Sequence, residues 1–331
     1  LSKDLKILAY ETTFYQNAGA SADLSPAVMV RTLFHGTNSY FIPNVKMTAY
    51  SCKTNLPPNT AFRGFGGPQG MFVIESALSH AAKELSISTH KLQKINLLKD
   101  GNEFPYGQIA DGVELNSIWG KMESKFDIET IEKEINDFNA NHSDMKKGFS
   151  LMPVTFGISF TKTPMNQARA LVHIYTDGSV GVTTGAVEMG QGVNTKMLQI
   201  AAQIFSITPK RVKLESTNTT RVANTSPSAA SSTADLNGKA LEKACNALMD
   251  RLKICAADHF NVSSHDVAVK DGVVYTNENQ TDLTWDQLVM MAFLKRICLT
   301  ENGHYSTPRI NFDMDKEKGH PFAYYVYGLA L

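Results

Sequence analysis

Three segments of this chain carry residue types that could bind an anion or a flat ring. The first, residues 61–67, reads Ala-Phe-Arg-Gly-Phe-Gly-Gly. Its glycines let the backbone adopt positive φ and approach a ligand, its phenylalanines offer flat apolar faces, and Arg63 adds a fixed positive charge. Apolar residues at helical spacing follow over residues 71–85, and the free N–H groups of a helix N-terminus favour an anion. A glycine-rich turn that only lets a helix pack closely is the alternative.

The second segment, residues 185–192, ends in Glu-Met-Gly-Gln-Gly. It lies between a hairpin predicted around Asp177-Gly178 and an amphipathic helix predicted for residues 193–205. Gln191 has an amide donor and an amide acceptor, which could read the edge of a heterocycle such as a pterin. A second glycine-rich loop therefore precedes a second helix.

The third segment, residues 224–238, is a run of small and hydroxyl residues before a helix predicted for residues 239–252. Small side chains expose backbone N–H groups, and hydroxyls such as those of Ser231 and Thr233 suit phosphate. A low-complexity linker is the alternative, but residues 225–234 carry no charge and a helix follows directly. We therefore expect a loop that wraps a ligand.

Four motifs together resemble the molybdenum-cofactor portion of the xanthine dehydrogenase family. They are residues 61–69, 156–161 (Phe-Gly-Ile-Ser-Phe-Thr), 188–192 and 226–231. They follow one another in the family's order along essentially the whole chain. The resemblance implies an α+β fold of the molybdenum-cofactor-binding type, with mixed sheets and with helices after glycine-rich loops.

The resemblance also implies a cofactor, molybdenum bound to the dithiolene of molybdopterin, held mostly by hydrogen bonds. The backbone of Ala61 and the side chain of Arg63 would lie beside the molybdenum, with Ala229 and Ala230 on its other side and no direct side-chain ligand. The residues that would contact the cofactor are Ala61, Phe62, Arg63, Gly190, Gln191, Ala229, Ala230, Ser231 and Thr233.

A purine is the substrate that the resemblance implies. Phe65 and Phe160 match two rings that sandwich the heterocycle. Arg31 matches an arginine that binds the purine carbonyl oxygen, where a guanidinium would stabilise growing negative charge, and Thr161 matches a hydroxyl that bonds another edge. Considered without the family, Arg31 would be an ordinary exposed helix arginine. An aldehyde oxidase is one alternative function, and a noncatalytic phosphate- or nucleotide-binding module is another.

No catalytic residue is assigned in this chain. The family's glutamate base belongs to a Gly-Glu-Pro-Pro-like segment that the sequence lacks, so we expect a piece of a longer polypeptide that is inactive alone. The four cysteines have no Cys-x-x-Cys spacing, and histidines such as His35 form no ligand pair at helical spacing. The resemblance then places 2Fe-2S, FAD and NAD on other segments or subunits of a homodimer or heteromultimer.

Composition predicts two packed domains and excludes several partners. Lys plus Arg and Asp plus Glu number 32 each, so charge does not favour nucleic acid or an anionic membrane. No apolar stretch is long enough to span a bilayer, and we expect a cytoplasmic protein. We place the boundary after residue 146, with residues 1–146 the C-terminal part of a first cofactor-binding domain and residues 147–331 the first part of a second.

Further elements follow from local signals. Residues 4–52 predict a strand, a helix and strands, and Asp127 is a plausible N-cap for a helix over residues 127–139. The remaining predictions are helices at 89–99 and 115–124, a hairpin at 270–272, a short helix from Thr284, a polar loop at 302–319 and a β-prone run at 322–331.

Overall fold

The chain folds into two compact units. A computed structural model describes residues 1–215 and 217–331, and the side chain of Ala230 lies outside this description. Unit 1 comprises Leu1–Thr161 and Arg309–Leu331, and unit 2 comprises Lys162–Pro308. The units do not divide at the expected boundary after residue 146, because strand β3 (Met152–Ile158) pairs with β13 (Tyr324–Ala330) and belongs to unit 1.

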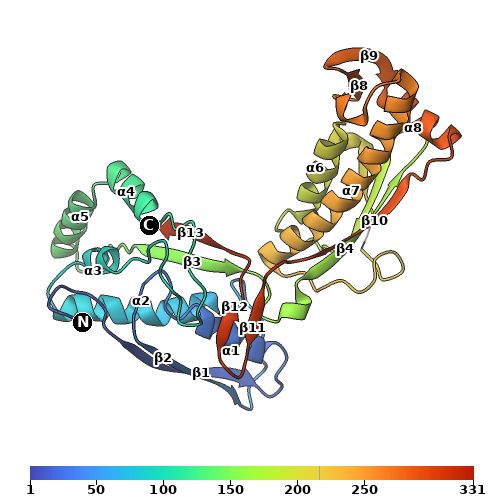
Figure 1. Cartoon of the computed structure of the whole chain (residues 1–331). Coiled ribbons are helices and arrows are strands. Elements are labelled where there is room, and N and C mark those ends of the chain that lie inside the picture. Colours follow the sequence, from blue (N-terminus) through green and yellow to red (C-terminus); the bar gives the residue numbers. More distant parts are fainter. Residues whose placement is uncertain (216) are drawn as a thin grey trace. The chain divides into compact units, whose positions relative to one another are not determined.

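Unit 1 contains small sheets and helices in several layers. Strands β1 and β2 run parallel, and α1 packs against β2 and α2 (Figure 1). Strands β11 and β12 form a hairpin, and β13 confirms the β-prone run near the end of the sequence. The elements besides β3 and β13 are β1 (Tyr10–Gly19), α1 (Ser25–Phe34), β2 (Val45–Lys53), α2 (Gly67–Glu84), α3 (Thr89–Ile95), α4 (Leu115–Lys125), α5 (Ile128–Asn141), β11 (Asn311–Asp313) and β12 (Lys318–His320).

The partly buried carboxylate of Glu75 accepts hydrogen bonds from three neighbouring side chains in unit 1. Glu75 Oε1 accepts hydrogen bonds from Asn38 Nδ2 and Tyr40 Oη, both at 2.7 Å, and its Oε2 accepts one from Gln93 Nε2 at 2.7 Å. Burial raises the pKa of Glu75, and the three donors partly offset this effect. The bonds join α2 to α3 and to the turn after α1.

Unit 2 is a four-stranded sheet covered by two helices. The strand order is β10-β4-β5-β6, α7 packs on β4 and β10, and α6 lies beside α7 (Figure 1). Strands β7, β8 and β9 form a separate antiparallel sheet. The elements are η1 (Thr163–Met165), β4 (Gln167–Ile174), β5 (Val180–Thr184), α6 (Val193–Phe205), η2 (Pro209–Arg211), β6 (Val212–Leu214), α7 (Ala230–Phe260), η3 (Ser264–Asp266), β7 (Val267–Lys270), β8 (Val273–Thr276), β9 (Asn279–Thr284), α8 (Trp285–Leu294) and β10 (Thr300–Ser306).

Several sequence predictions were wrong in extent, among them the helix predicted for residues 89–99, which ends at Ile95. Helix α7 begins at Ala230 and not at residue 239, because alanine favours helix and Leu236 buries its side chain on the face that Ala240 continues. The predicted polar loop at 302–319 contains β10, β11 and β12. Strand β10 exists because it finds a partner in β4, more than a hundred residues earlier in the chain.

The mixture of sheets and helices confirms the predicted α+β class. Asp127 is the N-cap of α5 and accepts a hydrogen bond from Thr130 N. Thr284 begins α8 with a capping box that includes Gln287. Among the described residues, none of the helices combines the length and the apolar character needed to cross a bilayer.

Candidate functional site

The first glycine-rich loop is held against α1 by very close backbone contacts. Gly66 is the N-cap of α2 with φ 103°, and a Cβ built there would lie 2.1 Å from the carbonyl oxygen of Val28. Thr32 Oγ1 donates to the carbonyl oxygen of Gly66 at 3.1 Å. Phe65 also has positive φ, at 53°. Gly66 is therefore required by a left-handed backbone and by close packing. Phe62, in the same loop, is 77 % exposed.

Arg31 is buried, with only 7 % of the residue exposed. Its Nη1 donates to the carbonyl oxygen of Gly157 at 3.0 Å, and its Nη2 donates to that of Ser159. Its Cζ lies 5.4 Å from the ring centre of Phe156 and 5.3 Å from that of Phe322. The prediction of an ordinary exposed helix arginine, made without the family, is therefore wrong for Arg31.

Arg31 is charged but has no acidic partner. No carboxylate of the described residues lies within salt-bridge distance of the guanidinium, and burial lowers the pKa of Arg31 to about 10. The group still carries its proton at neutral pH. Moving a charge out of water costs several kcal/mol unless a partner compensates. A buried charge without such a partner is therefore a candidate for a functional site.

Two residues that the sequence analysis did not assign to the site extend this contact along β3. Gly157 N–H donates to His35 Nε2 at 3.0 Å, and Asn38 Nδ2 donates to the carbonyl oxygen of Pro153 at 2.7 Å. Arg31, His35 and Asn38 stand four and three residues apart, which places them on one face of a helix and its following turn. That spacing of three residues with hydrogen-bonding side chains was the available signal.

Unit 1 thus brings together Arg31, the first glycine-rich loop and the motif of residues 156–161. A Cβ at Gly67, where α2 begins, would lie 2.6 Å from the ring of Phe156, so the glycine loop packs on β3. Phe160 and Thr161 follow directly after Ser159, whose carbonyl oxygen Arg31 binds, and both are half-buried like Phe65. The sandwich of Phe65 and Phe160 around a ring stays a prediction.

In unit 2, the second glycine-rich loop folds around its own glutamate. Glu188 Oε1 accepts from Gly190 N and Gly192 N, both at 2.9 Å, and its Oε2 accepts from Asn194 N at 3.0 Å. The backbone bonds from Asn194 and Gly192 hold the pKa of Glu188 below its usual range. The carboxylate therefore occupies the N-terminus of α6 that the sequence left available for a ligand.

Gln191 is also engaged within this loop. Its Nε2 donates to the carbonyl oxygen of Val187 at 2.8 Å, and its Oε1 accepts from Met189 N. Val187 N–H donates to Ser228 Oγ at 2.7 Å, which joins the second segment to the third. Unit 2 therefore brings together the two segments predicted to hold the pterin.

The third segment leads into the N-terminus of α7. Ala229 is the N-cap, its own side chain makes no capping bond, and the first turn contains no acid. Thr233 is buried and its Oγ1 accepts from Ala229 N at 2.6 Å, while Ser231 is exposed. Ala230 is the first residue of α7, and its predicted side-chain contacts lie outside the described residues.

These features fit an anionic, hydrogen-bonded cofactor. The N-cap residues of α2 and α7, Gly66 and Ala229, make no side-chain capping bond, and small residues leave the backbone there approachable. Thr225 Oγ1, beside Gly185, is buried without a hydrogen-bond partner in the described part of the chain. Within that part, no three His, Cys, Asp or Glu side chains gather as metal ligands. The donor set suits recognition by hydrogen bonds.

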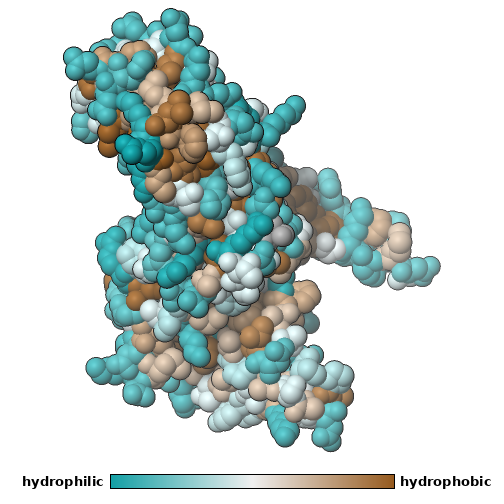
Figure 2. Space-filling view, turned by 90° about the vertical axis from the view of Figure 1, so that its right-hand side faces the viewer, coloured by the Kyte–Doolittle hydropathy of each residue, from teal (hydrophilic) through white to brown (hydrophobic). Residues whose placement is uncertain are grey.

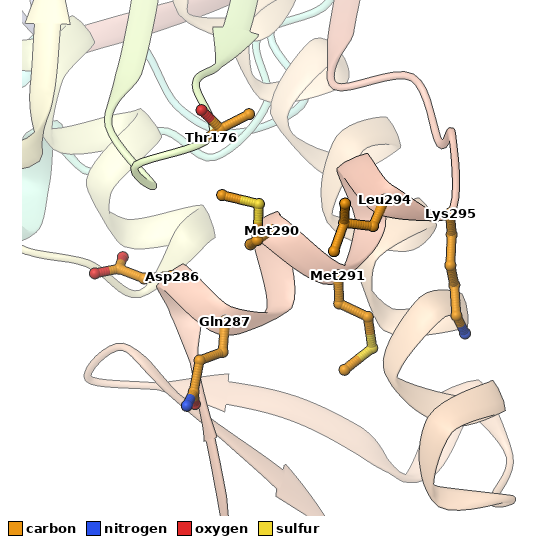
Figure 3. A pocket seen from close by; sticks show the side chains of 7 residues that line it. All are labelled: Thr176, Asp286, Gln287, Met290, Met291, Leu294 and Lys295. Carbon is orange, nitrogen blue, oxygen red and sulfur yellow. The ribbon is translucent and has the colours of Figure 1, made fainter.

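A separate apolar groove of about 620 Å³ lies along α8 and shares no residue with the motifs. Figure 3 shows Met290, Met291 and Leu294 beside it, with Asp286 at one end of the helix and Lys295 after the other. Apolar surface gathers on this part of unit 2 (Figure 2), where Leu294 is 71 % exposed.

Known proteins are similar to this chain over all of these segments. The family described as molybdopterin cofactor-binding domain matches residues 121–331, and a second family of the same description matches residues 1–97. The chain is 40 % identical over 328 residues to xanthine dehydrogenase of Oryza sativa subsp. japonica and 39 % identical over 328 residues to xanthine dehydrogenase/oxidase of Gallus gallus. These matches cover 99 % of the chain but 22 % and 23 % of the relatives, so the chain spans about a fifth of their length.

Solved structures share the fold. CO dehydrogenase from Oligotropha carboxidovorans aligns with a TM-score of 0.82 at 19 % identity, covering 99 % of this chain and 42 % of the other. The aldehyde oxidoreductase from Desulfovibrio desulfuricans aligns with a TM-score of 0.78 at 23 % identity, covering 98 % of this chain and 33 % of the other. The resemblance of the four motifs to the molybdenum-cofactor portion of xanthine dehydrogenases is confirmed.

Proposed function

Because the chain belongs to the molybdopterin cofactor-binding domain family, we propose that it is part of a xanthine dehydrogenase-type molybdenum hydroxylase that oxidises a purine such as hypoxanthine or xanthine. The identity to xanthine dehydrogenases along 99 % of the chain supports this proposal. The single structural observation that carries it is the buried guanidinium of Arg31, which has no carboxylate partner among the described residues.

Arg31 binds the carbonyl oxygen of the purine in this proposal. A guanidinium has five N–H donors, and two of the nitrogens of Arg31 already donate to the carbonyl oxygens of Gly157, in β3, and Ser159, just after it. Those bonds fix its orientation, and in this proposal the donors that they leave bind the purine. Burial strengthens the interaction of the charge with an oxygen that becomes more negative during nucleophilic attack on the ring.

We assign the other predicted substrate residues of unit 1 to the same purine. Phe65 and Phe160 hold the ring between them through their apolar faces, and Thr161 bonds a second edge of the purine. These three roles follow from the matched motifs, and the close packing of the glycine loop on β3 supports them.

Molybdopterin is the cofactor of the family, and it supplies the redox centre when bound. In unit 1 we assign contacts with the cofactor to Ala61, Phe62 and Arg63, in the loop before α2. In unit 2 the pterin and its phosphate are bound by Gly190, Gln191, Ala229, Ala230, Ser231 and Thr233. Gln191 and Thr233 now make hydrogen bonds within the chain, and they would have to give up those bonds to bond to the cofactor. The glutamate base and the 2Fe-2S, FAD and NAD sites belong to other parts of the longer protein.

Replacing Arg31 by methionine in the complete enzyme tests the proposal. We expect Arg31→Met to weaken transition-state binding of xanthine by about 2 to 4 kcal/mol, as the loss of an oxyanion donor does. Turnover of an aromatic aldehyde, which lacks the purine carbonyl, should change much less. The measurement is kcat/KM for both substrates, with molybdenum content and melting temperature as controls. Equal losses on both substrates contradict the role of Arg31.

The same preparation separates the alternatives. A wild-type enzyme that prefers the aldehyde to xanthine is an aldehyde oxidase. A full-length protein without molybdenum, and without pterin fluorescence after oxidation, is a noncatalytic phosphate- or nucleotide-binding module. The cytoplasmic location and the assembly as a homodimer or heteromultimer stay predictions.

A further inference from the structure

The outer edge of β3 is bonded to side chains in place of a neighbouring strand. On its other edge β3 pairs with β13, where Gly157 lies opposite Tyr325. On the outer edge, Gly157 donates its N–H to His35 Nε2 at 3.0 Å and accepts at its carbonyl oxygen from Arg31 Nη1 at 3.0 Å. An unpaired strand edge would otherwise leave these backbone groups buried without partners, at a cost of about 1 to 3 kcal/mol each.

Gly157 has no freedom to move away from this contact. A Cβ at this position would lie 2.4 Å from the ring of Phe322, so that ring fills the space a side chain would need. The ring of His35 packs in turn against Phe156 at 4.7 Å and against Phe322 at 5.3 Å between ring centres. His35 therefore contacts Phe156, which precedes Gly157, and Phe322, whose ring lies beside Gly157. It also binds the N–H group of Gly157 itself.

The hydrogen bonds also define the protonation of His35. Nε2 accepts from Gly157 N–H and so carries no proton, and Nδ1–H donates to the carbonyl oxygen of Arg31 at 3.1 Å. Burial, together with the nearby charge of Arg31, lowers the pKa of His35 to about 3. The imidazole is neutral, so Arg31 keeps its positive charge without a second cation beside it.

His35 is connected to the proposed substrate residues by a short path. Arg31, whose carbonyl oxygen His35 binds, reaches the carbonyl oxygens of both Gly157 and Ser159. The next two residues are Phe160 and Thr161. A shift of β3 at Gly157 would move the ring and the hydroxyl that the proposed function assigns to the purine.

We propose that His35 is a positioning residue for purine recognition, acting through its hydrogen bond from Gly157 N–H to hold Phe160, Thr161 and the guanidinium of Arg31 in register. This inference rests on the proposed function and deepens it. His35 does not touch the substrate. The bond to Gly157, more than the bond to Arg31, carries the effect, because Gly157 is the point at which α1 meets β3.

Two substitutions separate the two bonds of His35. In His35→Gln the side-chain amide reaches the position of Nε2 and can still accept from Gly157 N–H. In His35→Asn the amide reaches only the position of Nδ1, so it can donate to Arg31 but leaves Gly157 N–H unpaired. Both replacements are polar and smaller than histidine, which makes each the control for the other.

The experiment uses the complete molybdenum enzyme. We expect His35→Asn to lower kcat/KM for xanthine about tenfold, the effect of one unpaired buried hydrogen-bonding group, and His35→Gln to lower it by about twofold or less. Acetaldehyde, too small to reach from Arg31 to Thr161, should show a change of about twofold or less in both variants. Hydrogen exchange of peptides covering residues 152–161 should rise in His35→Asn and not in His35→Gln.

The outcomes distinguish this inference from the proposed function. A molybdenum-loaded wild-type enzyme that does not oxidise xanthine refutes the proposed function, while the exchange of residues 152–161 still reports on His35. Equal effects of the two variants on exchange and turnover, or equal losses on xanthine and acetaldehyde, overturn the inference. If His35→Asn does not accumulate as folded enzyme, a tenfold loss in His35→Gln is sufficient to overturn it.

Discussion

The hydrogen bonds of a single side chain can decide whether a nearby helix N-terminus is free to bind a ligand. The carboxylate of Glu188 accepts three backbone N–H groups of its own loop and the start of α6. It acts as an internal anion at a helix N-terminus, where negative charge is stabilising. The first turn of α7 contains no acid, so we propose this helix N-terminus as the better place in unit 2 for the phosphate of a cofactor.

Replacing Glu188 by glutamine tests this role. The pKa of Glu188 is lower in the folded state than in the unfolded chain, so its contribution to stability is present above the ordinary glutamate pKa of about 4.3 and is lost as pH falls through the folded value. Glu188→Gln should thus lower the melting temperature at neutral pH, and the difference from wild type should shrink in acid. Thermal melts across this pH range check it. Glu84→Gln, near the end of α2, is the control, and an equal effect there would argue against the cap.

At the scale of elements, glycines decide how closely α1 and α2 approach. A Cβ at Gly70 would lie 2.6 Å from the carbonyl oxygen of Thr32, and one at Gly66 even closer to that of Val28. The same glycines that resemble a ligand-binding loop therefore also permit close helix packing. The two interpretations of the motif, ligand loop and packing turn, are compatible.

Gly66→Ala should lower the free energy of unfolding by about 3 kcal/mol, because it adds a steric clash and requires alanine at positive φ. Gly120 is the matched control. It lies inside α4, where no described atom comes within 4 Å of a built Cβ, so Gly120→Ala should stabilise by about 0.5 to 1 kcal/mol. Denaturant unfolding monitored by circular dichroism measures both. Similar effects of the two substitutions would contradict the packing at Gly66.

At the scale of the whole molecule, the chain leaves unit 1 after Thr161 and returns to it at Arg309. The returning segment supplies β13, which pairs with β3, and Phe322, which is 2 % exposed in the core of unit 1. Unit 2 is a continuous segment with a sheet and helices of its own. Unit 1 therefore includes the last residues of the chain in its fold, and unit 2 does not.

Deleting residues 309–331 should unfold unit 1 and leave unit 2 folded. Unit 1 loses the partner of β3 and a large buried ring, and removing a buried phenylalanine alone costs about 3 to 5 kcal/mol. Hydrogen exchange, resolved by peptide, compares the two units in the full and shortened chains. Protection retained in β3 after the deletion, or lost throughout residues 162–308, would show that the division is not as described.

Local signals predicted much of the fold. The N-cap Asp127, the short helix from Thr284 and the turn at Asp177-Gly178 depend on residues a few positions apart, and all three are confirmed. The helix over residues 193–205 is confirmed for the same reason. The strands in residues 302–319 were missed because their pairing depends on distant partners such as β4.

The sequence by itself determined the family, the cofactor and most of the helices, because motif order and periodicity are properties of neighbouring residues. Only the tertiary structure decided the environments of the site residues. It buries Arg31 without an acid in the described chain, places Glu188 at the start of α6 and joins His35 to Gly157 across 122 residues. Such contacts depend on which backbone groups remain unpaired when distant segments pack, and no local pattern records that.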